Sequence, residues 1–258
     1  MTDEVIRWHL SGFDPTGQPF VAGIYPMLQD ETCFFLAVDF DKEGWREDAG
    51  AFRETCRAMD IPAVLERSRS GHGGHVWLFF EEPVTAASAR RLGSFVLTET
   101  MERRPDIGFG SYDRFFPNQD TLPQRGFGNL IALPLQKQSR DLGNSVFLDD
   151  HMVPHADQWA FLSSVQRIGR TRVEDVVRDA ERRGRVVGVR LPQMDEEDAE
   201  PWTAPPSRRR KEPAIAGDVP RTLELVVGNE IYIAKDGLAP GLRKPVAPFG
   251  GLSESRVL

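Results

Sequence analysis

Residues 33–41 read Cys-Phe-Phe-Leu-Ala-Val-Asp-Phe-Asp, a continuous apolar run that ends in two acidic residues. Such a run predicts a buried strand whose end reaches a functional edge of a sheet. On a strand, residues i and i+2 project from the same face, so Asp39 and Asp41 should point one way while Phe40 points into the core. The segment therefore predicts a central strand and a pair of carboxylates at its end.

The segments after this strand predict helices and strands in alternation. Apolar or small residues recur at helical spacing from Trp45 to Met59, and Ile61-Pro62 ends that helix. Two β-like runs, 63–66 and 75–80, flank a Gly-rich turn. A second helix is expected over 86–103, with Thr85 as its N-cap.

The following part of the chain predicts a loop, then shorter elements. An aromatic-, Pro- and Asn-rich stretch, 111–128, is expected to be a loop that leads into an apolar strand. We expect strands at 130–135, 146–148 and 186–191, and helices at 157–168 and 172–183. The helix at 172–183 is expected to be charged and solvent-facing. The alternation indicates an α/β or α+β domain with a mixed sheet over residues 1–192.

Composition changes after that domain. Residues 193–217 combine an acidic run, several prolines and the basic cluster 208–211, which predicts a charged, Pro-rich linker. Residues 218–258 form a short C-terminal segment with a β-like piece at 222–234 and a Pro- and Gly-rich end.

Composition and charge narrow the classes of protein. The chain has 258 residues, 40% hydrophobic and 28% charged, as is ordinary for a soluble globular protein. A net charge of −7 argues against a protein that coats nucleic acid by charge alone. Cys33 and Cys56 are expected to be reduced core thiols. No signal pattern or membrane-length apolar run is present, so we expect no membrane association and a cytoplasmic protein.

The acidic pair suggests a metal site. Two carboxylates on one face of a strand repel each other unless a cation lies between them. Hard oxygen ligands suit Mg²⁺ or Mn²⁺, which favour carboxylates together with substrate phosphates. The alternative is a solvated acidic turn at the end of the strand.

The Gly-rich turn over 70–74 suggests phosphate binding. Three glycines in four positions suit a sharp turn or a close approach to a ligand, and backbone N–H groups there can face a phosphate. His75 opens the next strand at the edge where the acids emerge, and it and Ser70 could donate to a triphosphate. Arg67 and Arg69 are candidates to neutralise it. The alternative is a tight hairpin with an incidental histidine.

A third acid follows in an aromatic context. Asp113 lies among Tyr112, Phe115 and Phe116, and a two-metal site uses a further carboxylate to share its ions. An ion pair with Arg114 or Arg67 is the competing interpretation. Several neighbouring side chains could contact base or ribose, or satisfy loop backbone groups: Asn118, Gln119, Asn129 and Gln136. Trp77, Phe115 and Phe116 are candidates for base stacking or for the core.

The order of these motifs resembles the archaeo-eukaryotic primase superfamily. An apolar strand ending in Asp-x-Asp is followed by Gly-Gly-His75 and then by Tyr-Asp113. The sequences of four segments, 33–42, 65–80, 111–120 and 128–136, most resemble the primase domain of TOTE conflict systems. The resemblance runs over about residues 1–192.

That resemblance implies a fold, a reaction and a set of site residues. The fold pairs an α/β unit with an RRM-like unit, with the active site between them. The implied activity is that of a DNA primase-polymerase in DNA replication, which transfers NTP or dNTP to a 3′-hydroxyl by two-metal catalysis. Asp39, Asp41 and Asp113 would hold Mg²⁺ or Mn²⁺. By this resemblance, His75 and Ser70 would bind the phosphates of the nucleotide. Arg67, Arg69, Gln119 and Asn129 are added as nucleotide-binding candidates from their positions in the sequence alone. Implied partners are a DNA template or primer, nucleoside triphosphates, and a helicase or nuclease.

Three departures leave alternatives open. Asp120 lies close to Asp113 and competes with it as the third acid. The strand at 132–134 lacks the arginine that many relatives carry. Relatives often have a Cys-containing segment upstream and a helicase region downstream, and the tail from Arg243 resembles no such continuation, as in a truncated product. The rival functions are a metal-dependent phosphodiesterase or nuclease, and a degenerate nucleic-acid-binding remnant.

Overall fold

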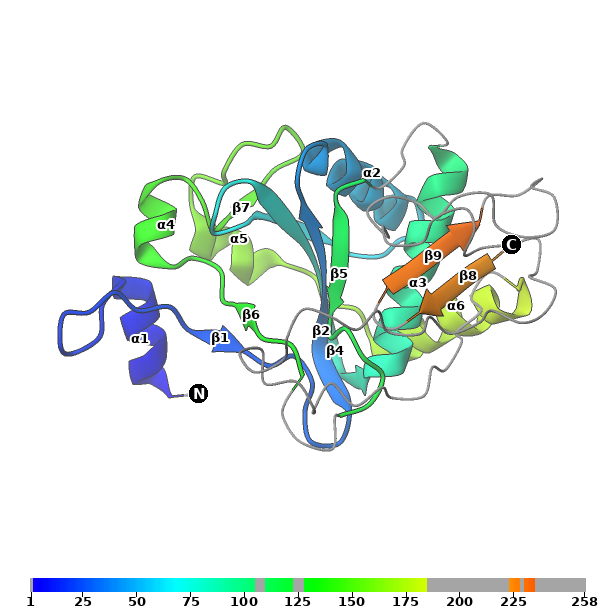
Figure 1. The fold of residues 1–258 in the computed structure, drawn as a ribbon, viewed down its shortest axis with the longest axis horizontal. Coiled ribbons are helices and arrows are strands. Elements are labelled where there is room, and N and C mark those ends of the chain that lie inside the picture. Colours follow the sequence, from blue (N-terminus) through cyan, green and yellow to red (C-terminus); the bar gives the residue numbers. More distant parts are fainter. Residues whose placement is uncertain (1, 105–109, 123–127, 185–222, 228–229, 235–258) are drawn as a thin grey trace, which may run out of the picture.

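A five-stranded antiparallel sheet forms the centre of the molecule (Figure 1). The computed structural model describes residues 2–104, 110–122 and 128–184, together with strands at 223–227 and 230–234. The strand order is β5-β2-β4-β3-β7. The bounds of these strands are Thr32–Asp41 (β2), Val64–Arg67 (β3), Gly73–Thr85 (β4), Tyr112–Phe116 (β5) and Val146–Leu148 (β7).

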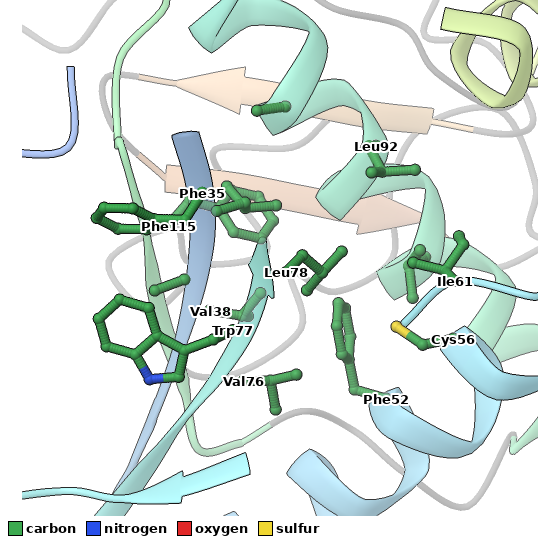
Figure 2. Close-up of a cluster of buried hydrophobic side chains, with 14 of the residues drawn as sticks. Phe35, Val38, Phe52, Cys56, Ile61, Val76, Trp77, Leu78, Leu92 and Phe115 are labelled. Atoms are coloured by element: carbon green, nitrogen blue, oxygen red, sulfur yellow. The ribbon is translucent and has the colours of Figure 1, made fainter. Parts of the chain in front are cut away.

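Helices cover one face of this sheet. Both α2 (Trp45–Ala58) and α3 (Ala86–Arg103) contact β2 and β4, and α6 (Arg170–Arg182) contacts β4 and α3. Alternate residues of β2, namely Leu36, Val38 and Phe40, are fully buried on this side. Figure 2 shows Val76 and Leu78 of β4 facing Phe52, Cys56 and Leu92 of the helices. The resulting core positions the central strands rigidly.

The opposite face of the sheet changes from apolar to polar along its length. Phe35, Ala37 and Asp39 of β2 lie opposite Phe79, Trp77 and His75 of β4. The Phe35 and Trp77 rings lie 5.1 Å apart, and both are buried. At Asp39 and His75 the same ladder carries ionisable side chains instead, which makes this end the candidate site.

The remaining elements are short and lie outside the five-stranded sheet. They are α1 (Asp3–Ser11), β1 (Gly23–Ile24), β6 (Ile131–Ala132), α4 (Lys137–Asp141), α5 (Gln158–Ser164) and the hairpin β8–β9 (Leu223–Val227, Glu230–Ala234). β1 pairs with β6, and α1 contacts α4. Buried His9 joins these pieces, because Ala22 N–H donates to its Nδ1 and its Nε2 lies 2.9 Å from the Pro134 carbonyl oxygen.

The predicted class, a mixed helix-and-sheet domain, is confirmed. The long helices at 45–59 and 86–103 form nearly as predicted, and Thr85 caps α3 through its side chain, 3.1 Å from Ser88 N. Cys33 and Cys56 are free, buried thiols, and burial raises the pKa of Cys33 to about 12.

Several predicted elements were wrong. The pairings among the named strands are antiparallel, so the sheet is not mixed. Residues 112–116 of the expected loop form β5, because a strand next to β2 satisfies their backbone groups. The expected strand at 130–135 shortens to β6. α6 is not only solvent-facing, since it buries Val173, Val176, Val177 and Ala180.

Other predictions fall partly outside the described residues. The strand at 186–191 and the linker at 193–217 lie outside them. The β-like piece at 222–234 contains β8 and β9. α1 was not predicted. Within the described segments, no helix has the length and apolar character needed to cross a membrane.

Candidate active site

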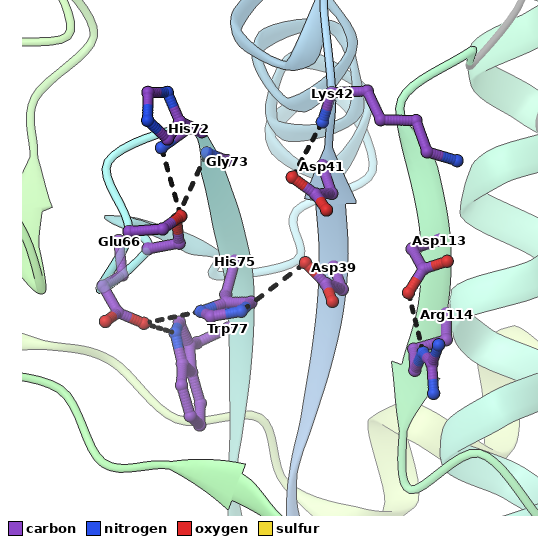
Figure 3. Close-up of polar contacts among 12 residues, drawn as sticks. Asp39, Asp41, Lys42, Glu66, His72, Gly73, His75, Trp77, Asp113 and Arg114 are labelled. Atoms are coloured by element: carbon purple, nitrogen blue, oxygen red, sulfur yellow. Dashed lines mark hydrogen bonds and ion pairs between the residues drawn. The ribbon is translucent and has the colours of Figure 1, made fainter. Parts of the chain in front are cut away.

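Three neighbouring strands bring the predicted acids and histidine together (Figure 3). Asp39, on central strand β2, lies opposite His75 on β4 and opposite Arg114 on β5. His75 Nε2 is 3.5 Å from Asp39 Oδ1. The Asp39 side chain is 19% exposed and that of His75 is 15% exposed, so this pair lies at the boundary between core and solvent.

Asp41 occupies the end of the same strand. Its Oδ1 accepts a hydrogen bond from Lys42 N–H at 2.8 Å, and Lys42 has a positive φ of 76°. Gly73 lies opposite Asp41, and a Cβ there would come within 2.5 Å of the Phe40 carbonyl oxygen. Glycine therefore allows the Gly-rich turn to pass close to the acidic strand end.

A β-bulge in β5 adds a third acid to this face. Arg114 lies opposite Asp39 while Tyr112 lies opposite Phe40, so Asp113 is the extra residue. Figure 3 shows Asp113 and Arg114 on the same side of the sheet as Asp39. Arg114 Nε donates to Asp113 Oδ2 at 2.7 Å. The predicted ion pair of Asp113 with Arg114 is thus present, and it does not remove Asp113 from the acidic group.

The electrostatics of the site reflect this crowding. Burial raises the pKa of Asp39 to about 6; His75 and Arg114 oppose the increase, whereas Asp113 and Asp41 add to it. Burial lowers the pKa of His75, but the hydrogen bond and charge of Glu66, with Asp39 and Asp41, raise it overall. The hydrogen bond that Arg114 donates to Asp113 raises the pKa of Arg114. The fold therefore holds several carboxyl groups close to an imidazole and a guanidinium.

Glu66 is the site residue that the sequence analysis missed. It lies on β3 opposite His75 and is 2% exposed. Its Oε2 is 3.0 Å from His75 Nδ1 and 2.9 Å from Trp77 Nε1. An acidic residue within an otherwise apolar β-like run was the available signal.

The structure separates the predicted phosphate-binding residues. Ser70 Oγ stays in the turn, where it accepts from His72 N–H at 3.2 Å. Arg67 donates to the carbonyls of Gly143 at 2.9 Å and Met152 at 3.2 Å, so it binds loop backbone instead of pairing with Asp113. Arg69 is exposed beside the turn.

Gln119 lies next to the segment that carries Asn129. A Cβ on Gly128, the residue before Asn129, would be 2.9 Å from Gln119 Nε2. Both side chains are partly buried. The structure places them near each other, and no described contact joins either to Asp39, Asp41 or His75.

Packing bears on two of the alternatives that the sequence left open. Arg90 Nη1 of α3 is 2.5 Å from Asp120 Oδ1, so Asp120 is held by a helix while Asp113 stands in the acidic group. Trp77, Phe115 and Phe116 are at most 8% exposed. Base stacking by these rings was therefore the wrong interpretation, and they belong to the core.

The donor set fits an open divalent-metal site. Among the described residues, no group of three or more Asp, Glu, His or Cys side chains is arranged so that it could hold a metal ion. Asp39 and Asp41 nevertheless present carboxylates from one face of β2, and Asp113 stands on the adjacent strand. Mg²⁺ commonly uses one or two carboxylates, waters and substrate phosphates. The residues thus suit an ion that arrives with its substrate.

An Asp-x-Asp strand paired with a histidine strand, with helices behind the sheet, defines a domain of the archaeo-eukaryotic primase class. The model of the family described as "TOTE conflict system, Archaeo-Eukaryotic Primase domain" matches residues 1–176, and the chain belongs to this family. This confirms the resemblance seen in the sequence. A comparison with curated proteins found no match.

Proposed function

We propose that this domain is a primase-type nucleotidyltransferase that transfers an NTP or dNTP to a 3′-hydroxyl on a nucleic-acid template. The observation that carries the proposal is the Asp39–His75 pair, 3.5 Å apart, next to Asp41 and Asp113 on one face of the sheet. Membership of the primase domain family supports it at the level of reaction class.

The carboxylates of Asp39, Asp41 and Asp113 would hold Mg²⁺ or Mn²⁺. Bound divalent ions supply charge neutralisation to the attacking and leaving oxygens in phosphoryl transfer. Crowding of the carboxylates at this edge favours a cation, because burial and the neighbouring acids raise the pKa of Asp39. Asp113 would exchange its hydrogen bond with Arg114 for this role, which leaves the Arg114 guanidinium beside the site.

The remaining residues would bind the nucleotide. His75 presents Nε2 to the acidic face and can donate to a phosphate oxygen. Exposed Ser70 and Arg69, at the adjacent turn, extend that contact, whereas Arg67 would first have to leave its two carbonyl partners. Gln119 and Asn129 stay candidates for base or ribose. In the reaction, the 3′-hydroxyl releases its proton to water and its oxygen bonds to the α-phosphorus. The bond between the α-phosphorus and the oxygen that bridges it to the β-phosphorus breaks, and pyrophosphate leaves.

We propose a DNA template or primer and nucleoside triphosphates as the direct partners. A helicase or nuclease is a candidate partner by family context. The turn at Ser70, which precedes the strand of His75, is exposed, and we propose that the strand end approaches from this side.

The test is nucleotide incorporation by the full chain, on primed and unprimed templates, with NTPs or dNTPs in Mg²⁺ or Mn²⁺. The Asp39→Ala plus Asp41→Ala variant should lose synthesis and keep its circular dichroism spectrum. A matched control, Asp175→Ala plus Asp179→Ala on α6, removes two carboxylates elsewhere and should retain synthesis.

Three results would overturn the proposal. Undiminished synthesis in the Asp39 and Asp41 variant would show that these carboxylates do not carry the reaction. Metal-dependent shortening of the labelled strand, without incorporation, would instead indicate a nuclease, and template binding without synthesis would indicate a binding remnant.

A further inference from the structure

A buried carboxylate lies directly behind the histidine of the site. Glu66 is 2% exposed, and its strand β3 is paired on both sides, with β4 and β7. A buried charge is costly unless hydrogen bonds satisfy it. Here Trp77 Nε1 lies 2.9 Å and His75 Nδ1 3.0 Å from Oε2, and Ser145 Oγ lies 3.4 Å from Oε1.

These partners define the direction of the hydrogen bonds. The indole N–H of Trp77 can only donate, and a serine hydroxyl can donate. As a carboxylate, Glu66 accepts at both oxygens. Oε1 accepts from the Ser145 hydroxyl, and Oε2 accepts from the Trp77 indole N–H and from the N–H at His75 Nδ1. Both donors on Oε2 come from β4, on residues two apart, so the same strand face holds them together.

The bond to Nδ1 determines what the other ring nitrogen can do. With Nδ1 held by Glu66, Nε2 is directed toward Asp39, at 3.5 Å, and toward the open face (Figure 3). Carboxylates that hold the distal nitrogen of a functional histidine fix both its tautomer and its ring orientation. A ring without that partner could rotate about its side-chain bonds and lose this direction.

We propose that Glu66 is a positioning residue, whose buried carboxylate holds His75 Nδ1 so that Nε2 faces the incoming nucleotide. The proposal rests on the proposed function for the identity of the ligand. It does not depend on that function for the geometry of the ring, which is testable in the free protein.

The kinetic test compares three variants with the wild type in the nucleotide incorporation assay. Glu66→Met, without an acceptor, should raise KM for the nucleotide about 10-fold or more, in the range seen for outer-sphere partners, with a smaller change in kcat. Glu66→Gln retains an amide oxygen and should recover most of that loss. Trp77→Phe removes the other donor on Oε2 and should stay within about 3-fold of wild type.

A double-mutant cycle separates positioning from general structure. In a His75→Ala background, Glu66→Met should cause no further rise in KM, because residues in one hydrogen-bond network are coupled. Independent, multiplicative effects of the two substitutions would overturn the proposal. An effect of Trp77→Phe as large as that of Glu66→Met would overturn it too.

The second test needs no activity. In ¹H–¹⁵N spectra of the full chain, His75 should show a proton on Nδ1 that is protected from exchange and is lost in Glu66→Met. A wild-type ring with its proton only on Nε2 would refute the proposal even if synthesis is present. If synthesis is absent but the Nδ1 proton is present, the proposed function fails and the positioning contact stands.

One further variant covers a folding failure. If Glu66→Met does not fold, Glu66→Met plus Trp77→Phe removes the buried indole N–H that would otherwise lack its acceptor. Loss of the protected Nδ1 proton in this folded variant supports the proposal, and its persistence refutes it.

Discussion

The two faces of the central sheet use the same strands in opposite ways. On the helix-covered face, Leu36, Val38 and Phe40 are fully buried among apolar side chains. On the other face, Asp39 alternates with them on β2 and meets His75 and Arg114 across the ladders. One face supplies the apolar burial that stabilises the fold. The other holds charges whose mutual repulsion and desolvation reduce stability.

This difference shows how a well-packed apolar core can hold in place a group of charged side chains that would otherwise destabilise the fold. Each ionisable residue of the site is one position away from a fully buried apolar residue, so the core determines where the carboxylates stand. Substitutions on the helix face should therefore change stability, whereas those on the site face should change activity, and some should raise stability.

The largest expected effect is on the site face, at the third acid. Asp113→Asn should lower synthesis about 1,000-fold, equivalent to about 4 kcal/mol of barrier, because an amide cannot replace the negative charge. Incorporation kinetics at saturating nucleotide measure it. Asp120→Asn, matched in chemistry but held by Arg90 on α3, should keep most activity per folded molecule. If Asp120→Asn were the more damaging, Asp120 would be the third acid.

The next effect belongs to the helix face. Phe40→Ala should lower the free energy of unfolding by about 3–5 kcal/mol, as is typical for a buried phenylalanine. Phe34→Ala on the same strand removes a side chain that is 49% exposed and should cost less than about 1 kcal/mol. Urea titrations measure both. Equal losses at the two positions would contradict the assignment of Phe40 to the core.

A smaller effect of opposite sign is expected at Asp39. Its folded pKa, about 6, is above the ordinary value of 3.8, so the unfolded state binds fewer protons between these values, and stability falls as pH rises through this window. Asp39→Asn lacks this loss and should be more stable by about 1–3 kcal/mol at pH 7.5 in chelator, with the gain shrinking toward pH 4.

Asp30 offers a control with the reverse sign. Hydrogen bonds from the Thr32 side chain and backbone lower the pKa of exposed Asp30, so its contribution is present above the ordinary pKa and lost as pH falls. Asp30→Asn should therefore reduce stability at pH 7.5. Thermal unfolding across pH 4–8 compares the two variants, and a loss of stability in Asp39→Asn at pH 7.5 would argue against a destabilising charge there.

The smallest effect concerns the cap of α3. Thr85→Ala should cost about 1 kcal/mol, because it removes the oxygen that accepts from Ser88 N–H at 3.1 Å. Thr85→Ser keeps that oxygen and should be close to wild type. Urea titration provides the measurement, and nucleotide incorporation per folded molecule should not change in either variant. Equal stability of the alanine and serine variants would show that the cap contributes little.

Local patterns account for the parts of the fold that were predicted well. The long apolar run of β2, the helical period of α2 and the Thr85 cap of α3 each depend on residues close in sequence. β5 was missed because its aromatic and polar residues do not alternate, since the bulge at Asp113 interrupts the pattern of the strand. Glu66 was missed because its burial depends on Phe147 of β7 and on the preceding Ser145, which lie about 80 positions away.

The sequence by itself determined the family, the Asp-x-Asp strand, the order of the three motifs and the two buried thiols. Three features of the site depend on the tertiary fold. A bulge places Asp113 on the strand next to Asp39, Arg67 donates to the carbonyls of Gly143 and Met152, and Glu66 forms a hydrogen bond with His75. The physical reason is the range of the interactions: side-chain periodicity is set within one strand or helix, whereas strand register, burial and hydrogen-bond partners arise only when distant segments pair.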